Sequence, residues 1–452
     1  MFKKIILIIS FILISCNLLA ADTITQSEEF KLKNGMKVVL IPNHKTPAIS
    51  HMVWYNVGSV NDPLGKSGLA HFLEHMMFKS TANLKEGDFF KKVSENGGEL
   101  NAFTNLNYTG YYENITIDKL PLVMQLESDR MTKLNLNPEE VIKERQVIIQ
   151  ERHLRYDTNP QALLHEQMLA ALYINHPNHR PVIGWRHEME DLQLEDVRSF
   201  YKTYYRPENA VLVVAGDITM EKLKPLAEKY YGYITVPKIK HKEIVLHEPK
   251  HIAARRILSC DVRVNIDTLY RSYLTSPTDL NNLSKDFALA IAEYIVGGNK
   301  FSRLYDLLVN KMKLATNVRV DYNLVKPEAP GYLDVYIAAK EKVKLSDIER
   351  ELNKEIDKLI NHGVTKNEFE EAKIALSAKN IYDKESFKEL GYIYGIMSIY
   401  SIPFSYFENW SDNINSISLD QVNSVIKEVF QSTQSVTGLL YNDEKNCKNY
   451  VN

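Results

Sequence analysis

Two segments of this chain repeat the same pattern at an offset of 225 residues, about half of its 452 residues. The matched positions are Leu194/Leu419, Val197/Val422, Ser199/Ser424, Lys202/Lys427 and Tyr205/Phe430. Each segment has helical spacing and leads into an apolar, strand-like stretch, at residues 210–215 and 435–441. An internal duplication explains this spacing, although so few identities can also arise by coincidence. The pattern therefore predicts two halves with the same fold.

Composition sets the boundaries of these halves. A two-lysine head and a nearly pure apolar run end in two alanines, so residues 1–21 are predicted to be a secretory signal peptide. Residues 236–250 are rich in Lys, His and Pro, have little periodicity, and are predicted to be a linker. The mature chain then has an N-terminal half at residues 22–235 and a C-terminal half at residues 251–452.

The signal sequence predicts export to a bacterial periplasm. Residues 13–16 also resemble a bacterial lipobox, in which case Cys16 would be lipidated and would anchor the protein to a membrane. The two remaining cysteines are too few for a disulfide scaffold or a Cys-rich metal site. Cys260 and Cys447 can pair in an exported protein, but two free, partly buried thiols are the expectation.

The charge of the chain indicates no polyanionic partner. The formal net charge is −2 for 55 basic and 57 acidic residues, and it becomes −4 without the two lysines of the signal. No basic cluster suggests nucleic acid, and no later segment is long and apolar enough to span a bilayer. A composition of 44% hydrophobic and 25% charged residues is that of an ordinary globular protein.

Residues 65–78 carry the strongest chemical signal and are predicted to form a helix. One face is an apolar stripe of Leu69, Phe72, Leu73 and Met76. His71, Glu74 and His75 share the opposite face in the order H-x-x-E-H. Two imidazoles one helical turn apart can bind one cation, and Glu74 is within reach of a water on that cation. A histidine pair at this spacing is often only a solvated surface, and the motif still lacks a third ligand.

A second helix, predicted at residues 138–156, supplies two candidate carboxylates. Glu144 and Glu151 lie in line with Val147 and Ile148, whereas Arg145, Ile149 and Arg152 are predicted to turn away. Either both carboxylates pair with basic residues at the surface, or one is the third metal ligand and the other supports the site. Spacing alone does not choose between these, and it does not identify the ligand. Other histidines are expected to be ordinary surface or loop residues: His51, His153, His176, His179 and His187.

Taken together, these stretches resemble the inverzincin zinc peptidases of the pitrilysin, insulin-degrading and mitochondrial-processing type. The matching residues are Gly65-x-x-Gly68-Leu69-Ala70-His71-Phe72-Leu73-Glu74-His75-Met76-x-Phe78, Gly97-Gly98-x-x-Asn101-Ala102-x-Thr104 and Glu144-Arg145-x-Val147-Ile148-x-x-Glu151. The resemblance covers nearly the whole mature chain. It implies an α+β fold of two homologous half-shell domains, each an antiparallel sheet flanked by helices, that enclose a chamber.

The resemblance also implies roles for single residues. His71, His75 and Glu151 match the ligands of one Zn²⁺, Glu74 matches the catalytic base, and Glu144 matches the supporting acid. At the substrate, Asn101 and Ala102 match residues of a strand edge that pairs with the peptide backbone, and Phe78 matches an aromatic beside the scissile bond. The implied activity is cleavage of peptides or unfolded segments by a zinc endopeptidase.

One departure from the family pattern bears on activity. Active members usually carry an Arg and, seven residues later, a Tyr in the second half, and this chain has Val309 and Thr316 there. The hypothesis is therefore that a homologous partner subunit supplies Arg and Tyr in a heterodimer. Two alternatives are a non-catalytic assembly subunit of the same family, and a bare metal-binding or storage module.

Overall fold

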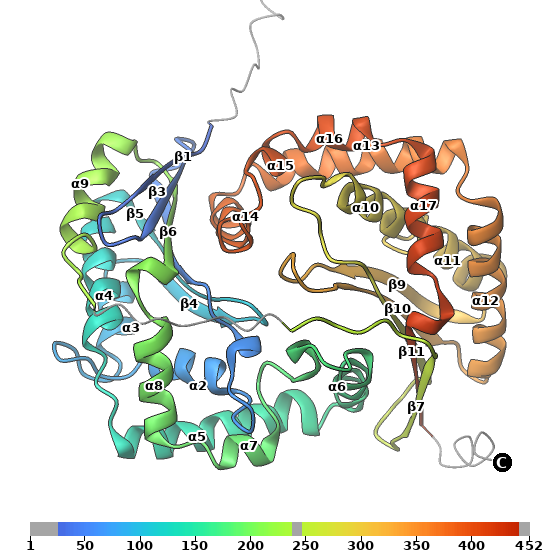
Figure 1. Ribbon diagram of the computed structural model, residues 1–452, viewed down its shortest axis with the longest axis horizontal. Helices are drawn as coiled ribbons and strands as arrows, with labels where there is room; N and C mark the ends of the chain where they lie inside the picture. Colours follow the sequence, from blue (N-terminus) through green and yellow to red (C-terminus); the bar gives the residue numbers. More distant parts are fainter. Residues whose placement is uncertain (1–25, 237–245, 443–452) are drawn as a thin grey trace, which may run out of the picture.

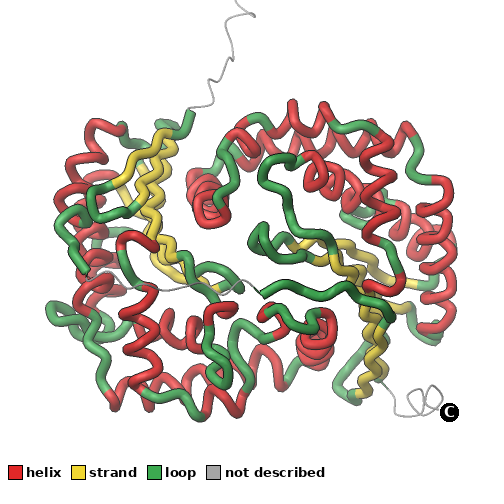
Figure 2. The backbone as a smooth tube through the Cα atoms, viewed as in Figure 1, coloured by secondary structure: helices red, strands yellow, loops and turns green. Residues whose placement is uncertain are grey.

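The protein consists of two similar α+β halves joined side by side (Figure 1). The computed structural model describes residues 26–236 and 246–442. The predicted signal peptide with Cys16, most of the predicted linker, and Cys447 lie outside the described residues. Helices form most of the outer layer, with the strands inside (Figure 2). No described helix is long and apolar enough to cross a membrane.

A six-stranded sheet in the order β1-β2-β6-β3-β5-β4 forms the base of the N-terminal half. Its strands are β1(Glu28–Lys31), β2(Lys37–Pro42), β3(Ala48–Tyr55), β4(Glu99–Thr104), β5(Thr109–Thr116) and β6(Ala210–Gly216). Neighbouring strands are antiparallel except β2 and β6, which are parallel. The predicted antiparallel sheet is thus mixed at one pair, because the chain returns through several helices before β6 enters between β2 and β3.

The C-terminal half repeats this order as β7-β11-β8-β10-β9. Its strands are β7(Arg255–Cys260), β8(Thr268–Leu274), β9(Ala315–Asn323), β10(Tyr332–Ala339) and β11(Ser435–Tyr441). In the described part of this half the only parallel pair joins β7 and β11, which take the places of β2 and β6. Strand β11 lies 225 residues after β6 and takes the same place in its sheet. The shared topology agrees with the predicted duplication.

Helices cover both sheets. The N-terminal half has α2(Leu69–Met76), α3(Asp88–Glu95), α4(Leu120–Lys133), α5(Pro138–Arg152), α6(Pro160–Leu172), α7(Arg186–Glu190), α8(Leu194–Tyr204) and α9(Met220–Tyr230). The C-terminal half has α10(Ser284–Val296), α11(Arg303–Tyr305), α12(Leu345–His362), α13(Lys366–Asp383), α14(Phe387–Tyr400), α15(Ser405–Glu408), α16(Trp410–Ser416) and α17(Leu419–Val429). Two π-helical turns follow α5 and α11, at His153–Asp157 and Asp306–Lys311.

Each half lends one helix to the sheet of the other. Helix α6 packs Leu164, Met168 and Leu172 against strands of the C-terminal sheet. Helix α14 packs in return on β3 and β6 of the N-terminal sheet, through Tyr394 and Met397 among others (Figure 1). Burial of these apolar side chains across the boundary makes the two halves one cooperative unit.

The contact between α14 and the N-terminal sheet predicts a destabilising substitution. A Cβ added at Gly395 would lie 2.0 Å from the buried indole of Trp54. One at Gly391 would lie 2.8 Å from the sulfur of the flexible Met52 side chain and 3.4 Å from the Ser50 hydroxyl, which is an ordinary contact. Both Gly→Ala changes gain helix propensity, but only Gly395→Ala forces a rigid ring to move. We expect Gly395→Ala to have a free energy of unfolding roughly 1–3 kcal/mol below that of Gly391→Ala in chemical denaturation. Equal stabilities would contradict this packing.

One histidine expected at the surface lies instead in a buried charged cluster. His51 is fully buried, with Nδ1 2.7 Å from Glu113 Oε2 and Nε2 3.0 Å from the Tyr231 hydroxyl. Arg130 pairs with Glu127 in the same interior, also fully buried. Burial lowers the pKa of His51 to about 4, so the ring is neutral at physiological pH. The alternation of β3 turns His51 to the face of the sheet that carries this cluster, and α14 covers the opposite face.

The expected free thiol at Cys260 is wrong. Cys260 ends β7 and is disulfide-bonded in the structure. Such a bond is compatible with the predicted export signal and an oxidising compartment.

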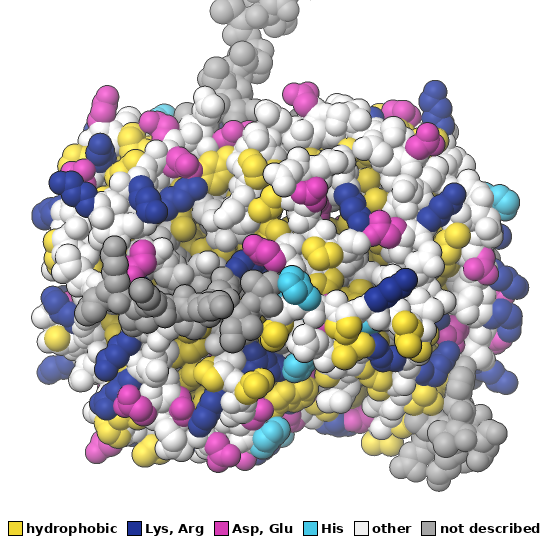
Figure 3. Space-filling model, viewed as in Figure 1, with side chains coloured by type: hydrophobic (Ala, Val, Ile, Leu, Met, Phe, Trp, Pro, Cys, Tyr) yellow, Lys and Arg dark blue, Asp and Glu magenta, His cyan; other side chains and the backbone are white. Residues whose placement is uncertain are grey.

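On the face of the molecule drawn in Figure 3, acidic and basic side chains are interspersed without a large field of one sign.

Candidate metal centre

Helix α2 is fixed at its N-terminus by a residue six positions upstream. The Asp62 carboxylate accepts hydrogen bonds from the backbone N–H groups of Gly68 and Ala70, both at 2.8 Å. Gly68 has a φ of 88°, a left-handed conformation that glycine adopts without strain. The hydroxyl of Ser67, which has the residue type of a helix cap, accepts instead from the N–H of Trp185. Asp62 therefore satisfies the free amides at the start of the motif helix.

The two faces of α2 are divided as their spacing predicts. The apolar stripe of Leu69, Phe72, Leu73 and Met76 is at most 1% exposed and packs into the core of the N-terminal half. On the other face, the His71 and His75 rings lie with centroids 4.8 Å apart. This face is also largely shielded, since His71 is 8% and Glu74 9% exposed.

Helix α5 brings Glu151 to both imidazoles. Its Oε2 lies 3.2 Å from His75 Nε2 and 3.8 Å from His71 Nε2, while Oε1 pairs with Arg155 at 3.0 Å. Candidate ligand atoms of His71, His75 and Glu151 all lie within 4.8 Å of one another. Among the described residues, this is the only group of three or more His, Cys, Asp or Glu side chains so arranged.

Glu144 contacts His75 but does not belong to the group of three candidate ligands. Its Oε1 is 2.8 Å from His75 Nδ1 and its Oε2 is 2.6 Å from Lys79 Nζ. These two hydrogen bonds outweigh burial and hold the pKa of Glu144 below its ordinary value. A carboxylate on the far nitrogen of a ligand histidine fixes its ring orientation and tautomer. Glu144 and Glu151 thus both have the basic neighbours that surface carboxylates would have, in addition to their histidine contacts.

Helix α5 is buried on more sides than predicted. Arg152, expected to turn away, is 5% exposed and forms a salt bridge with Glu166 at 2.8 Å. Ile149 is also buried, whereas Val147 is half exposed. Helix α5 lies between α2 and α7. One of its sides presents the carboxylates, and another side packs against neighbouring elements.

The histidines are electrostatically unequal in the metal-free protein. Burial lowers the pKa of His71 to about 4, with a smaller contribution from His75. Burial also acts against the charge on His75, but its hydrogen bonds to Glu144 and Glu151 raise its pKa to about 9. Two carboxylates close to one imidazole create a site that favours a cation.

Glu74 is placed to exchange a proton beside this cluster. Its Oε2 accepts a hydrogen bond of 2.5 Å from the hydroxyl of Thr104 on β4. Burial raises the pKa of Glu74 above its ordinary value despite this hydrogen bond. A carboxyl with a raised pKa accepts a proton more readily than an exposed glutamate does. Thr104 belongs to a matched motif, but no role followed from its sequence position.

The residues matched to substrate binding lie on neighbouring elements. Asn101 and Ala102 are on β4, the edge strand of its sheet, and the Ala102 N–H donates to the Asn101 side chain at 2.9 Å. Phe78 is half-buried after α2 and packs with its ring centroid 5.0 Å from that of Phe90. Phe90 is 44% exposed, so an apolar surface continues outward from Phe78.

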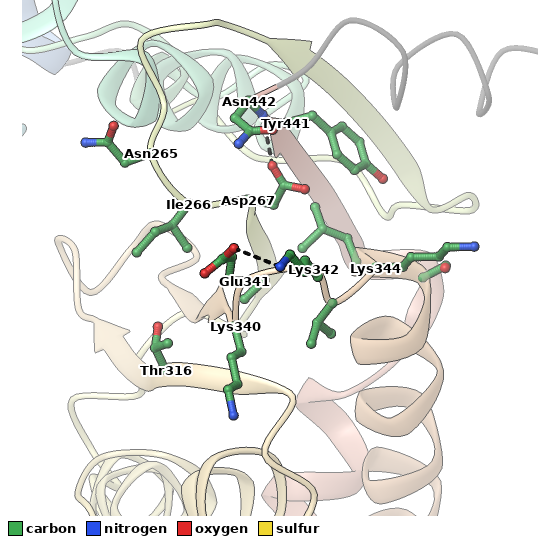
Figure 4. A pocket seen from close by; sticks show the side chains of 14 residues that line it. Asn265, Ile266, Asp267, Thr316, Lys340, Glu341, Lys342, Lys344, Tyr441 and Asn442 are labelled. Carbon is green, nitrogen blue, oxygen red and sulfur yellow. Dashed lines mark hydrogen bonds and ion pairs between the residues drawn. The ribbon is translucent and has the colours of Figure 1, made fainter.

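The two positions that depart from the family pattern lie in the C-terminal half. Val309 is half-buried in the π-helical turn after α11, and Thr316 is exposed on β9. Thr316 lines a cavity of about 950 Å³, together with Asp267 and Lys340 (Figure 4). This cavity contains none of the histidines or glutamates of the candidate metal centre.

The donor set fits zinc. Two imidazole nitrogens and one carboxylate oxygen are the ligand types of catalytic zinc sites, which keep a fourth position for water. Structural zinc would require four protein ligands, and a hard cation such as Mg²⁺ would require mostly oxygen. The two-half fold, the H-x-x-E-H helix α2 and a third candidate ligand on α5 are the features expected of the inverted-motif class of metallopeptidases.

Comparison with known families places the chain more narrowly. The family described as "Insulinase (Peptidase family M16)" matches residues 37–185, and the "Peptidase M16 inactive domain" matches residues 191–376. The protein therefore belongs to peptidase family M16. The second match begins just before α8 of the N-terminal half and ends within α13 of the half that lacks the H-x-x-E-H motif.

Relatives extend this likeness over nearly the whole chain. The zinc protease PqqE of Helicobacter pylori is 30% identical over 93% of this chain and 94% of its own length. A crystal structure of a protease from Helicobacter pylori has a TM-score of 0.87 and 29% identity, covering 92% of this chain and all of that one. The periplasmic protease PqqL of Escherichia coli has a TM-score of 0.78 at 18% identity, and the match covers 93% of this chain but 48% of PqqL. At that identity, PqqL shows a shared fold only.

Proposed function

We propose that this protein is a zinc-dependent endopeptidase that cleaves peptides or unfolded segments. The observation that carries this proposal is the convergence of His71, His75 and Glu151, from two helices, beside the buried carboxyl of Glu74. Its membership of a peptidase family and the names of its zinc-protease relatives agree with this assignment.

The residues of the site divide the work of peptide hydrolysis. His71, His75 and Glu151 would hold the zinc, and Glu144 would orient His75 through Nδ1. Zinc, when bound, lowers the pKa of water and polarises the peptide carbonyl. Glu74 accepts the proton of the attacking water and returns it to the leaving amide nitrogen. Burial raises the pKa of Glu74, which makes this carboxylate a stronger proton acceptor than an exposed glutamate.

The substrate would bind along β4. An edge strand presents backbone N–H and C=O groups that an extended peptide can pair with, here at Asn101 and Ala102. Phe78 and Phe90 would contact an apolar substrate side chain next to the cleaved bond. A chamber between the two halves would admit extended chains and exclude folded proteins. Export of the protein, through the signal predicted at residues 1–21, would make periplasmic peptides its substrates.

The active unit would include a second, homologous subunit. The side chain of Val309 has no hydrogen-bond donor, and the hydroxyl of Thr316 sits on a much shorter side chain than that of Tyr and donates to the carbonyl of Ala338 at 3.3 Å. This chain resembles about half of PqqL, and such a length relation is expected if two units of this kind make one enzyme. A partner with Arg and Tyr at these positions would stabilise the oxyanion of the tetrahedral intermediate.

The alternative is a non-catalytic assembly subunit. The match of residues 191–376 to an inactive domain, together with the absence of Arg and Tyr, favours it, whereas the complete H-x-x-E-H cluster favours the enzyme.

Metal removal separates the two functions. We expect a zinc chelator to abolish cleavage of an internally quenched peptide by the chain with its partner, and one equivalent of Zn²⁺ to restore it. The measurements are turnover and zinc content by mass spectrometry. A protein that binds zinc but shows no cleavage at any zinc concentration, with or without its partner, would instead be an assembly subunit or a metal-storage module.

A further inference from the structure

Thr104 donates a hydrogen bond to Glu74, the proposed catalytic base, although Thr104 does not belong to the zinc motif. Its hydroxyl lies 2.5 Å from Oε2 of Glu74, and the two residues come from different elements, β4 and α2. Within the described residues, Oε1 of Glu74 has no hydrogen-bond donor. One carboxylate oxygen is thus held by the protein, and the other is left to exchange a proton.

The pleat of β4 explains why Thr104 can reach this position. Leu100 and Ala102 pack on the core of the N-terminal half, the side on which α2 lies, and Thr104 follows them at the same two-residue spacing. Phe103 points to the other face and joins the cluster that contains α14. The Thr104 hydroxyl therefore faces α2 for the same reason that the Ala102 methyl does.

The hydroxyl of Thr109 is the neighbour of the Thr104 hydroxyl, and it does not require the Thr104 proton. Thr104 is paired with Thr109 across the β4–β5 ladder, and their hydroxyl oxygens are 3.5 Å apart. Thr109 is fully buried and donates its own proton to the carbonyl of Val57 at 2.9 Å. Thr104 can then give its single proton to the carboxylate and does not have to share it with the ladder.

We infer that Thr104 is a positioning residue that fixes the carboxylate of Glu74 for proton transfer, an inference that rests on the peptidase function proposed above. A glutamate side chain has several rotatable bonds, so a free carboxylate would spend much of its time away from the reactive arrangement. A hydrogen bond to one oxygen removes that freedom, and an error of about 1 Å in such a group can cost about 10²-fold in rate. Asn101 and Ala102 lie on the same strand, so substrate pairing and base orientation share one element.

Three substitutions test this role in the zinc-loaded chain with its partner subunit. Thr104→Val removes the hydroxyl at nearly constant volume, Thr104→Ser keeps it, and Thr109→Val removes the neighbouring hydroxyl, which does not contact Glu74. We expect Thr104→Val to lower kcat by about 10- to 100-fold on a quenched peptide, with KM within about twofold and zinc content unchanged. Thr104→Ser should retain most of kcat, and Thr109→Val should affect thermal stability more than kcat. If Thr104→Val does not fold, Thr104→Ala takes its place.

A crystal structure of the Thr104→Val protein gives a readout that does not depend on turnover. We expect the Glu74 carboxylate to leave its present position or to occupy more than one conformation, with His71, His75 and Glu151 unmoved. A wild-type kcat and an unmoved Glu74 in Thr104→Val, while Glu74→Gln is inactive, would overturn this inference alone. Full activity of Glu74→Gln would overturn the proposed function itself. A fall in kcat that Thr104→Ser shares equally would mean that Thr104 acts by packing and not through its hydroxyl.

Discussion

Replacing Glu74 with Gln is expected to lower peptide cleavage by about 10²- to 10⁴-fold and to leave zinc bound. The amide keeps the size of the side chain and can still accept the hydrogen bond from Thr104, but it cannot take a proton from water. Glu74 does not belong to the three-residue ligand cluster, so zinc affinity should change little. The measurements are kcat with a quenched peptide and zinc content of the purified variant.

A matched control for this change is available on α5. Glu140 is half-buried and accepts a hydrogen bond from the Ser80 hydroxyl at 3.1 Å, so Glu140→Gln removes the same charge from a similar setting. It should leave both turnover and zinc content unchanged. Wild-type turnover by Glu74→Gln would exclude this residue as the base and would leave the assembly or storage alternatives.

Addition of a homologous subunit that carries Arg and Tyr at the positions of Val309 and Thr316 is expected to raise the cleavage rate by about 10²-fold or more. That factor is typical for one preorganised donor to an oxyanion, and here neither the Arg nor the Tyr is present. The partner to test is the product of any adjacent homologous reading frame. Activity titrated against partner concentration should saturate at one partner for each zinc-bearing chain.

The partner's own residues provide the control for this second prediction. A partner with its Arg changed to Ala and its Tyr to Phe should still bind but should not activate, which separates chemistry from simple stabilisation of the complex. Full-rate cleavage by the purified chain as a monomer would contradict the pairing, and the C-terminal half would then contribute to the site through other residues.

Local periodicity in the sequence predicted most of the elements that build the site. The stripe of Leu69, Phe72, Leu73 and Met76 is buried as its spacing indicates, and this places His71 and His75 together on the other face of α2. Spacing could not choose between Glu144 and Glu151, because both lie on the same side of α5 and both have basic neighbours. The structure separates them by distance: only Glu151 approaches both imidazoles.

Features that depend on long-range packing could not be read from the sequence. To predict the exchange of α6 and α14 between the halves, one must know which sheet each helix covers. The apolar face of a helix does not show this in the sequence. His51 was expected at the surface because a single histidine shows no partner in sequence, whereas Glu113 lies 62 positions away. The same reason applies to Thr104, whose role arises only when α2 and β4 are packed.

Anomalous diffraction at the zinc absorption edge, from crystals of the zinc-loaded chain, tests the central claim most directly. The account predicts a single strong peak about 2.0–2.2 Å from Nε2 of His71, Nε2 of His75 and a carboxylate oxygen of Glu151, with a solvent oxygen in the fourth position facing Glu74. A peak elsewhere, a fourth protein ligand that closes the site, or a Glu151 side chain turned away from the ion would contradict it.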